Sequence, residues 1–281
     1  MQKRIKSFDG TRINYDISRI RGNDNFLIFL HGAGANLTTW RDIRAFFHRI
    51  GVPTIAIDLR GHGKSDRPAL LEEYNLENFA KDIYEIIKEE KVKGAILIGH
   101  SLGGMVAITF HKLYPKLSKS YIIISSSYKA PRLLKTIFKR FSFLVNFLNK
   151  FLKKIKLSGT KFSHLNEKIF KKTKDRNIFR IGWDMIKTSL KSWLFTFENI
   201  TQFDGMDILK HIKKPVLILE GKEDTIINTE QAKRLHKMIK DSILKIIPKA
   251  SHMIILTNPA LLEKEIYDFI KHIHGFVKKK E

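Results

Sequence analysis

Short runs of apolar residues recur along the chain and are separated by segments with helical spacing. Because these runs do not alternate with polar residues, they are typical of strands buried on both faces of a parallel sheet. The expected strands are residues 26–30, 54–57, 95–98, 121–124 and 216–219, with a more mixed run at 243–247. Strands that alternate with helices predict an α/β fold with a doubly wound, mostly parallel sheet.

Two further patterns define local elements. Apolar residues between Leu76 and Ile87 recur at steps of three and four, which predicts a helix capped by Asn75 or a nearby residue. Residues 2–18 read as two strand-like segments on either side of Asp9-Gly10. Asp-Gly between such segments favours a hairpin with a two-residue turn.

The alternation stops between about residues 128 and 203, where no strand-like run occurs. We expect residues 128–205 to form a helical cap inserted into a core domain made of residues 1–127 and 206–281. Between Leu134 and Ile155 apolar residues again recur at helical steps, with lysines beside that stripe.

Composition limits the class of protein. A chain of 281 residues suits one α/β domain with an insertion. It has no cysteine, which excludes disulfides and thiolate metal sites and favours a reducing cytoplasm. The first residues show no apolar run of the kind found in secretory signals. The longest stretch without an acidic residue, Lys or Arg, 94–111, contains His100, Ser101 and glycines, which favours strand, turn and helix over a membrane span.

The net charge of +24 is concentrated in one segment, because residues 129–176 contain fifteen Lys or Arg and two acidic residues. We favour a cap whose apolar stripe packs on the core and lines an acyl pocket, with the lysines in solvent. The alternative is a basic surface that makes peripheral contact with an anionic membrane. Nucleic acid is a weaker candidate partner because no recognised binding motif accompanies the lysines.

The chemistry centres on Gly99-His100-Ser101-Leu102-Gly103, which directly follows an apolar run. A Gly-x-Ser-x-Gly between a strand and a helix is the pattern of a nucleophile elbow, which exposes the serine at a tight turn. A serine hydroxyl needs a base and a carboxylate that orients the base. Asp224 follows the run 216–219, and His252 follows the last predicted strand, so they are the predicted acid and base.

Neighbouring candidates are weaker. Glu223 precedes Asp224, but successive loop residues usually point in different directions. His31, His62 and His100 belong to Gly-rich motifs, where hydrogen bonds to the backbone are the favoured role. His111 and His236 lie in helical patterns and are interpreted as ordinary surface or core residues.

An acyl-transfer site also needs backbone donors for the oxyanion. The predicted donors are the amides of Leu102, directly after the serine, and of Ala33, in His31-Gly32-Ala33-Gly34 after the first apolar run. Such a loop could also bind phosphate, but no Gly-x-Gly-x-x-Gly and no Walker lysine occurs, which disfavours nucleotides. No set of side chains has metal-ligand spacing, so we expect neither metal nor cofactor.

Together these motifs resemble the α/β-hydrolase superfamily over nearly the whole chain. Residues 31–34 with Trp40 resemble its oxyanion loop, 58–66 its D-x-R-G-x-G-x-S turn, and 99–104 its elbow. Asp224 and His252 match the remaining triad positions. The resemblance implies a helical cap after the sixth strand, and Asp58, Arg60 and Ser65 are interpreted as loop braces without a chemical role.

The serine at the elbow narrows the activity that the resemblance implies. Related haloalkane dehalogenases and epoxide hydrolases have Asp at this position. The sequence is similar to esterases and monoacylglycerol-lipase-like members, which implies hydrolysis of carboxylic esters through an acyl-enzyme, and the Phe- and Leu-rich cap favours medium or longer acyl chains. Lactone hydrolysis, carbon–carbon bond hydrolysis and haloperoxidase-like chemistry use the same triad. A ligand-binding receptor on this fold is the alternative from another class.

Overall fold

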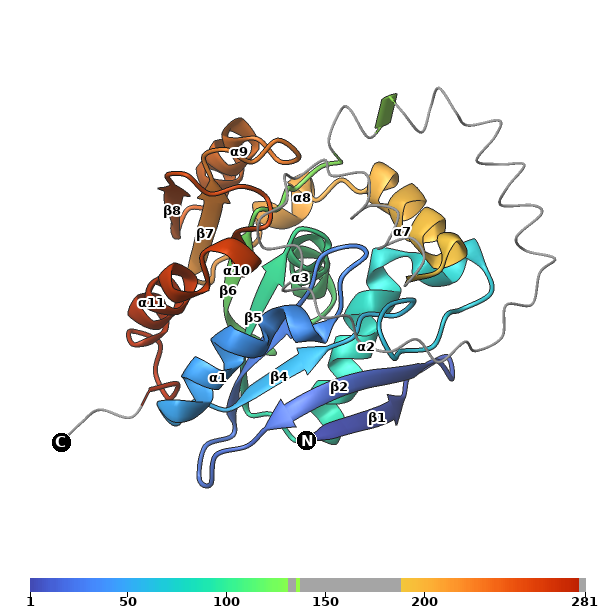
Figure 1. Ribbon diagram of the computed structural model, residues 1–281, viewed down its shortest axis with the longest axis horizontal. Coiled ribbons are helices and arrows are strands. Elements are labelled where there is room, and N and C mark those ends of the chain that lie inside the picture. Colours follow the sequence, from blue (N-terminus) through green and yellow to red (C-terminus); the bar gives the residue numbers. More distant parts are fainter. Residues whose placement is uncertain (131–134, 137–187, 278–281) are drawn as a thin grey trace.

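The computed structural model of the chain contains one eight-stranded sheet in the order β1-β2-β4-β3-β5-β6-β7-β8 (Figure 1). It describes residues 1–130, 135–136 and 188–277. β3 to β8 pair in parallel, whereas β1 with β2 and β2 with β4 are antiparallel. The strands are β1 (Gln2–Lys6), β2 (Arg12–Ser18), β3 (Asn25–Leu30), β4 (Thr54–Ile57), β5 (Gly94–His100), β6 (Ser118–Ile124), β7 (Val216–Gly221) and β8 (Ser242–Ile247). The predicted α/β class with a mostly parallel sheet is confirmed.

Helices cover both faces of this sheet (Figure 1). On β3, Phe26, Ile28 and Leu30 pack in the cluster that contains α2 and α3, while Leu27 and Phe29 pack with α1 and α11. Each apolar run is therefore buried on two sides, which explains its lack of alternation. The helices described are η1 (Leu37–Trp40), α1 (Arg41–Arg49), η2 (Leu71–Tyr74), α2 (Leu76–Glu89), α3 (Leu102–Leu113), α7 (Leu190–Gln202), α8 (Met206–Leu209), α9 (Thr229–Met238), α10 (Ile254–Thr257) and α11 (Pro259–Ile270).

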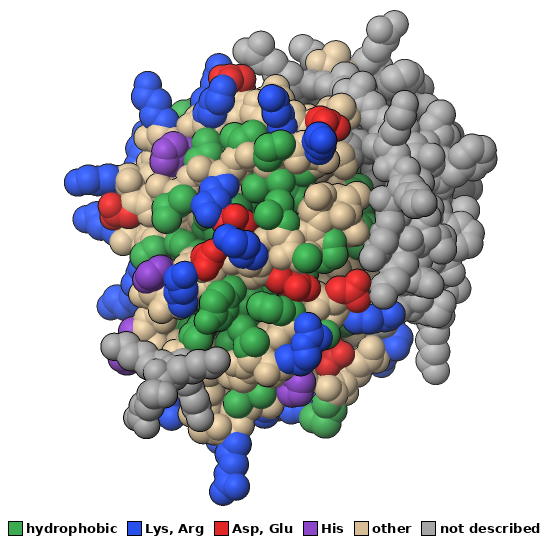
Figure 2. Space-filling view, turned by 60° about the vertical axis from the view of Figure 1, so that its left-hand side comes forward, with side chains coloured by type: hydrophobic (Ala, Val, Ile, Leu, Met, Phe, Trp, Pro, Cys, Tyr) green, Lys and Arg blue, Asp and Glu red, His purple; other side chains and the backbone are tan. Residues whose placement is uncertain are grey.

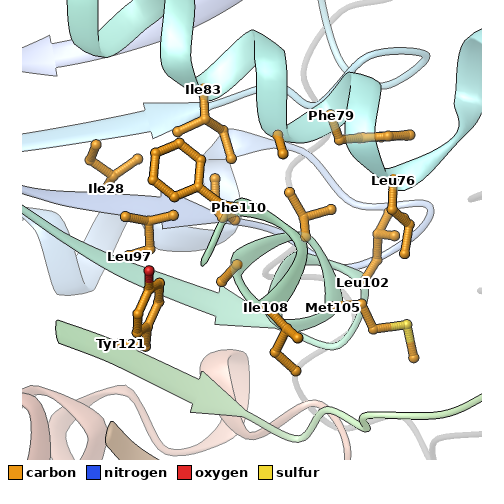
Figure 3. Close-up of a cluster of buried hydrophobic side chains, with 14 of the residues drawn as sticks. Ile28, Leu76, Phe79, Ile83, Leu97, Leu102, Met105, Ile108, Phe110 and Tyr121 are labelled. Atoms are coloured by element: carbon orange, nitrogen blue, oxygen red, sulfur yellow. The ribbon is translucent and has the colours of Figure 1, made fainter. Parts of the chain in front are cut away.

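The cluster under α2 and α3 fixes the start of α3. Figure 3 shows Ile83 of α2 close to Phe110 of α3, and Phe79 of α2 belongs to the same buried cluster. Leu102, the first residue of α3, is 1% exposed and belongs to this cluster. Burial of a leucine side chain contributes about 2 kcal/mol, so the beginning of α3 is held firmly against α2.

Local signals in the sequence are confirmed in part. Asn75 caps α2 as predicted, since its side chain accepts a hydrogen bond from the amide of Asn78 at 2.9 Å. The hairpin β1–β2 also forms, but the prediction of a two-residue turn at Asp9-Gly10 is wrong. Its turn spans Ser7 to Gly10, where the Gly10 amide donates to the Ser7 carbonyl at 3.0 Å and Gly10 has a φ of 89°. Asp9 stays within this turn, where its side chain accepts hydrogen bonds from the Thr11 amide at 3.0 Å and from the Arg60 guanidinium at 2.9 Å.

The turn after β4 is a buried polar brace. Asp58 accepts hydrogen bonds from the amide of Leu37 at 2.8 Å, the amide of Lys64 at 2.9 Å and the side chain of Asn14 at 2.8 Å. Ser65 donates to the Asp58 carbonyl at 2.5 Å. These contacts join three segments of chain, and they agree with the structural role predicted for this turn.

Arg60 holds the same turn against α2. Its guanidinium is fully buried and donates to both carboxylate oxygens of Asp82, at 2.7 and 2.8 Å. A buried ion pair contributes little by itself, but a buried charge without its partner is strongly unfavourable.

We therefore expect Asp82→Ala to lower the free energy of unfolding by about 3–5 kcal/mol, measured by urea denaturation. Asp24→Ala is the matched control, because Asp24 pairs with Lys93 at the exposed surface. Its loss should cost less than about 1 kcal/mol. Equal effects of the two substitutions would contradict the bracing role of Arg60.

The two ends of the predicted cap segment lie side by side. Lys129 and Asp204 form an antiparallel bridge, and their side chains pair at 3.0 Å. The Gly205 amide donates to the Tyr128 carbonyl at 2.7 Å, and the Ala130 amide to the Phe203 carbonyl at 3.3 Å. We call these paired residues, 128–130 and 203–205, the neck. Residues 137–187, with most of the predicted amphipathic stripe, lie outside the described residues, so the division into core and cap stays a prediction.

Charge on the face shown in Figure 2 is dispersed. In Figure 2, Lys and Arg side chains are spread over this face with hydrophobic and acidic side chains between them. Membrane contact through residues 129–176 remains a prediction, because that segment lies almost entirely outside the described residues. Within the described part of the chain, no helix combines the length and the apolar character needed to cross a bilayer.

Candidate active site

The elbow lies at the carboxyl end of β5, in the middle of the parallel part of the sheet. Ser101 lies between β5 and α3 with φ 50° and ψ −113°, a conformation that is costly for a residue with a side chain. A Cβ on Gly99 would lie 2.2 Å from the Gly103 carbonyl oxygen, and one on Gly103 would lie 2.2 Å from the Leu30 carbonyl oxygen. The two glycines are therefore required by close backbone approach, and the strained backbone belongs to the serine itself.

Two of the three predicted triad side chains are joined by a direct hydrogen bond. His252 Nδ1 lies 2.7 Å from Asp224 Oδ2, and both residues are buried. Asp224 Oδ1 also accepts hydrogen bonds from the amides of Ile226 and Ile227, each at 2.8 Å. Burial alone would raise the pKa of Asp224, but the His252 hydrogen bond and charge and these two amides lower it below its usual value.

This network determines the tautomer of His252. Since Asp224 is an anion, it can only accept, and the proton between the two residues belongs to Nδ1 of the imidazole. The other nitrogen, Nε2, then carries a lone pair and can accept a proton. This arrangement is the one that a general base requires.

His100 connects the elbow to the His252 loop. Its Nε2 lies 2.8 Å from the His252 carbonyl oxygen, so Nε2 carries the proton and donates, and the two rings are 4.9 Å apart. The residue directly before Ser101 therefore fixes the backbone of His252, the predicted base. His100 has the backbone-binding role that the sequence favours for it.

The loop after β3 lies over the elbow. A Cβ on Gly32 would lie 2.9 Å from His100 Nδ1 and 3.4 Å from Ser101 Cβ, so only glycine fits. His31 holds this loop, because its Nδ1 lies 2.7 Å from the Gly32 carbonyl and its Nε2 accepts from the Leu59 amide at 3.0 Å. Ala33, the predicted donor, is the next residue of the loop and is half-buried.

The second predicted donor lies at the first turn of α3. The earliest helical hydrogen bonds are those of Gly104 and Met105 to the Ser101 carbonyl, at 3.0 and 3.3 Å. The Leu102 amide precedes them at the positive end of the helix dipole. Its buried side chain (Figure 3) holds that amide in place.

A comparison with known families shows which family the chain belongs to, because a family model described as alpha/beta hydrolase fold matches residues 25–259. The chain belongs to the α/β-hydrolase family. The relatives of the chain include hydrolases, among them an esterase and epoxide hydrolases.

Two relatives of this α/β-hydrolase show how similar its sequence is to those of known proteins. It is 36% identical over 257 residues to a pimeloyl-[acyl-carrier protein] methyl ester esterase of Wigglesworthia glossinidia brevipalpis, covering 87% of this chain and 93% of the relative. It is 26% identical over 274 residues to the human protein ABHD8, covering 96% of this chain. The match spans 58% of the length of ABHD8.

A solved structure shows the same fold. The esterase EaEST from Exiguobacterium antarcticum superposes with a TM-score of 0.74, covering 96% of this chain and all of that chain. The two sequences are 21% identical, so this likeness concerns the architecture of the α/β-hydrolase alone.

Two residues of the site were not predicted from the sequence. Ser126, after β6, donates from its hydroxyl to the Ser101 carbonyl at 2.6 Å and so supports the elbow. Glu220, near the end of β7, is fully buried four residues before Asp224. The available signals were a run of three serines after an apolar strand and a single acidic residue at the end of another apolar strand.

A metal site in this α/β-hydrolase would require several donor side chains close together. No group of three or more His, Asp or Glu side chains is placed to hold a metal ion within residues 1–130, 135–136 and 188–277. Among the buried histidines near the site, burial first and then the neighbouring His31 lower the pKa of His62 to about 3, which keeps its imidazole neutral.

Proposed function

We propose that this α/β-hydrolase is a serine hydrolase that cleaves carboxylic esters through an acyl-enzyme intermediate. Ser101 is the nucleophile, His252 the general base and Asp224 the residue that orients the base. The observation that carries the proposal is the 2.7 Å hydrogen bond between His252 Nδ1 and Asp224 Oδ2. His100 ties this pair to the elbow, where Ser101 has the strained backbone of a nucleophile.

The residues support a two-step reaction. The Ser101 oxygen attacks the ester carbonyl carbon while its proton passes to His252 Nε2. The amides of Leu102 and Ala33 stabilise the oxyanion that forms. His252 then gives the proton to the departing alcohol as the carbon–oxygen bond breaks. Water, activated by the same imidazole, hydrolyses the acyl-enzyme and releases the acid.

We further propose an acyl group of medium or greater length. A relative that is 36% identical over most of its length is named for the methyl ester of a pimeloyl group, which is an acyl ester. The sequence of the segment 128–205, rich in Phe and Leu, supports the same class of substrate.

A panel of p-nitrophenyl esters from acetate to decanoate tests this proposal. Each buried methylene contributes up to about 0.8 kcal/mol, so we expect kcat/KM to rise at least about tenfold between acetate and octanoate. A fluorophosphonate probe should label the protein at Ser101. Turnover of acetate alone would contradict the chain-length proposal, and absence of turnover and labelling would contradict the serine hydrolase.

A further inference from the structure

Glu220 is a buried carboxyl group that the proposed reaction does not use. It is the second-to-last residue of β7 and has 0% of its surface exposed. The loop that carries Asp224 follows β7 directly. It begins with a turn in which the Asp224 amide donates to the Gly221 carbonyl at 3.2 Å. The Glu220 carboxyl group is in hydrogen-bonding range of the Asp224 carboxyl group, which in turn contacts His252.

The hydrogen bonds of Glu220 involve one of its oxygens. Oε1 accepts from the Gly221 amide at 3.0 Å and from the Ser125 hydroxyl at 3.3 Å. Oε2 is buried and accepts no hydrogen bond from a donor among the residues that the structure describes, and the Glu220 carboxyl lies close enough to Asp224 for a hydrogen bond between the two side chains when Glu220 carries a proton. A buried carboxylate with one unsatisfied oxygen is highly unfavourable, whereas a protonated carboxyl is tolerated much better.

Ser125 extends this contact to the elbow. It has a φ of 43°, its amide donates to the Leu219 carbonyl at 2.9 Å, and its hydroxyl contacts Glu220. The next residue, Ser126, holds the Ser101 carbonyl. Glu220 thus lies between the loop of the predicted acid and the segment that supports the predicted nucleophile.

The two carboxyl groups differ in their surroundings. Asp224 accepts two amide hydrogen bonds and one from His252, which stabilise its negative charge. Glu220 has no cation in contact with it in the described structure, and burial, reinforced by the negative charge of Asp224, raises its pKa to about 10. At neutral pH the pair therefore contains one anion, on Asp224, and one proton, on Glu220.

Few other charged groups surround Glu220. Opposite it on β8 is Ile246, and the nearby Lys245 is paired with Glu265 of α11. On α9, which packs against β7, Lys233 is paired with the exposed Glu230. The β6 side contributes the uncharged Ser125. Among the residues that the structure describes, Asp224 is the charged group that acts on Glu220, and His252 lies beyond it.

We propose that Glu220 is a positioning residue that stays protonated so that Asp224 remains the only anion holding His252. Loss of the Glu220 proton creates a second buried negative charge beside Asp224, and repulsion between the two carboxylates moves Asp224 away from His252 Nδ1. The imidazole then loses the partner that fixes its tautomer. This role rests on the proposed function, since it acts through the proposed base.

The test is the dependence of kcat on pH for an ester substrate, corrected for spontaneous hydrolysis. For the wild-type protein, we expect kcat to be about tenfold lower at about pH 11 than at about pH 9, following ionisation of one group. Glu220→Gln should keep kcat within about threefold at about pH 7.5, because an amide is neutral and can still accept from Gly221 and Ser125. Its alkaline decrease should be absent.

Glu223→Gln is the matched control. Glu223 is exposed and adjacent to Asp224, so its substitution should leave the wild-type alkaline decrease unchanged. A constant wild-type kcat up to about pH 11 would overturn the proposal, as would the same alkaline decrease in Glu220→Gln. Loss of activity at neutral pH in a folded Glu220→Gln protein would overturn it too, because the charged form would then be required.

A second readout does not depend on turnover. The NMR signal of the proton on His252 Nδ1 should disappear in the wild-type protein over the same alkaline range and should persist in Glu220→Gln. A signal that persists in the wild-type protein at high pH would contradict the role of Glu220. This outcome can be measured even if the Glu220→Gln protein does not fold. Full activity of Ser101→Ala would refute the proposed function instead, without changing the result for this proton.

Discussion

Ser101→Ala is expected to lower kcat on a p-nitrophenyl ester by at least about a thousandfold. The substitution removes the oxygen proposed to form the acyl-enzyme and leaves the proposed oxyanion donors and the imidazole in place. KM should change little, because the hydroxyl makes its main contribution in the transition state. Steady-state kinetics with titrated protein measures both parameters.

Ser18→Ala is the matched control for this loss. Ser18, at the end of β2, contacts His48 at 2.7 Å in an exposed position and lies outside the elbow and its supporting loops. Its substitution should leave kcat within about twofold, because Ser18 does not contact the candidate site. The free energy of unfolding should change by about 0.5 kcal/mol or less, as is usual for surface substitutions. A Ser101→Ala protein that retains a tenth of the wild-type activity would refute the proposal that Ser101 is the nucleophile.

Asp224→Asn is expected to lower kcat by about ten-thousandfold while the protein stays folded. An asparagine amide can donate to His252 Nδ1, which places the imidazole proton on Nε2, where it cannot accept the proton of Ser101. The loss arises from the tautomer, so it should be accompanied by little change in melting temperature. Stopped assays over hours, with the wild-type protein diluted to match, measure a difference of this size.

Asp207→Asn controls for the removal of a carboxylate. Asp207 lies on α8 with its side chain 94% exposed and a single surface contact to Lys210. Its kcat should equal that of the wild type. An Asp224→Asn protein within about tenfold of wild type would show that His252 does not depend on Asp224.

The sheet could be predicted from the sequence because burial on both faces leaves a clear signal. The runs at 26–30, 95–98 and 216–219 carry no polar residue, and each became a strand between two helical layers. The position of β4 between β2 and β3 could not be predicted, because an apolar run does not indicate which strand will be its neighbour. The hairpin turn was predicted too short, because the Ser7 amide donates to the Thr11 carbonyl at 2.8 Å and so leaves three residues between this bonded pair.

The candidate site shows the same division. Ser101 is identified by a local pattern, and Asp224 and His252 by their positions after strands, so these residues could be selected from sequence order. Glu220 and Ser126 could not be selected, since their relevance comes from contacts across three different strands. In the sequence, Glu220 is an unremarkable acidic residue at a strand end, and only its burial shows that it is unusual.

The neck has a consequence for how such a chain can diversify. Its backbone hydrogen bonds, such as that of Gly205 to Tyr128, hold the two ends of the intervening segment together regardless of what lies between. Each doubling of a flexible loop adds only about 0.6 kcal/mol of closure entropy. Evolution can therefore lengthen, shorten or exchange that segment as a cassette, while the scaffold that carries Ser101 keeps its geometry.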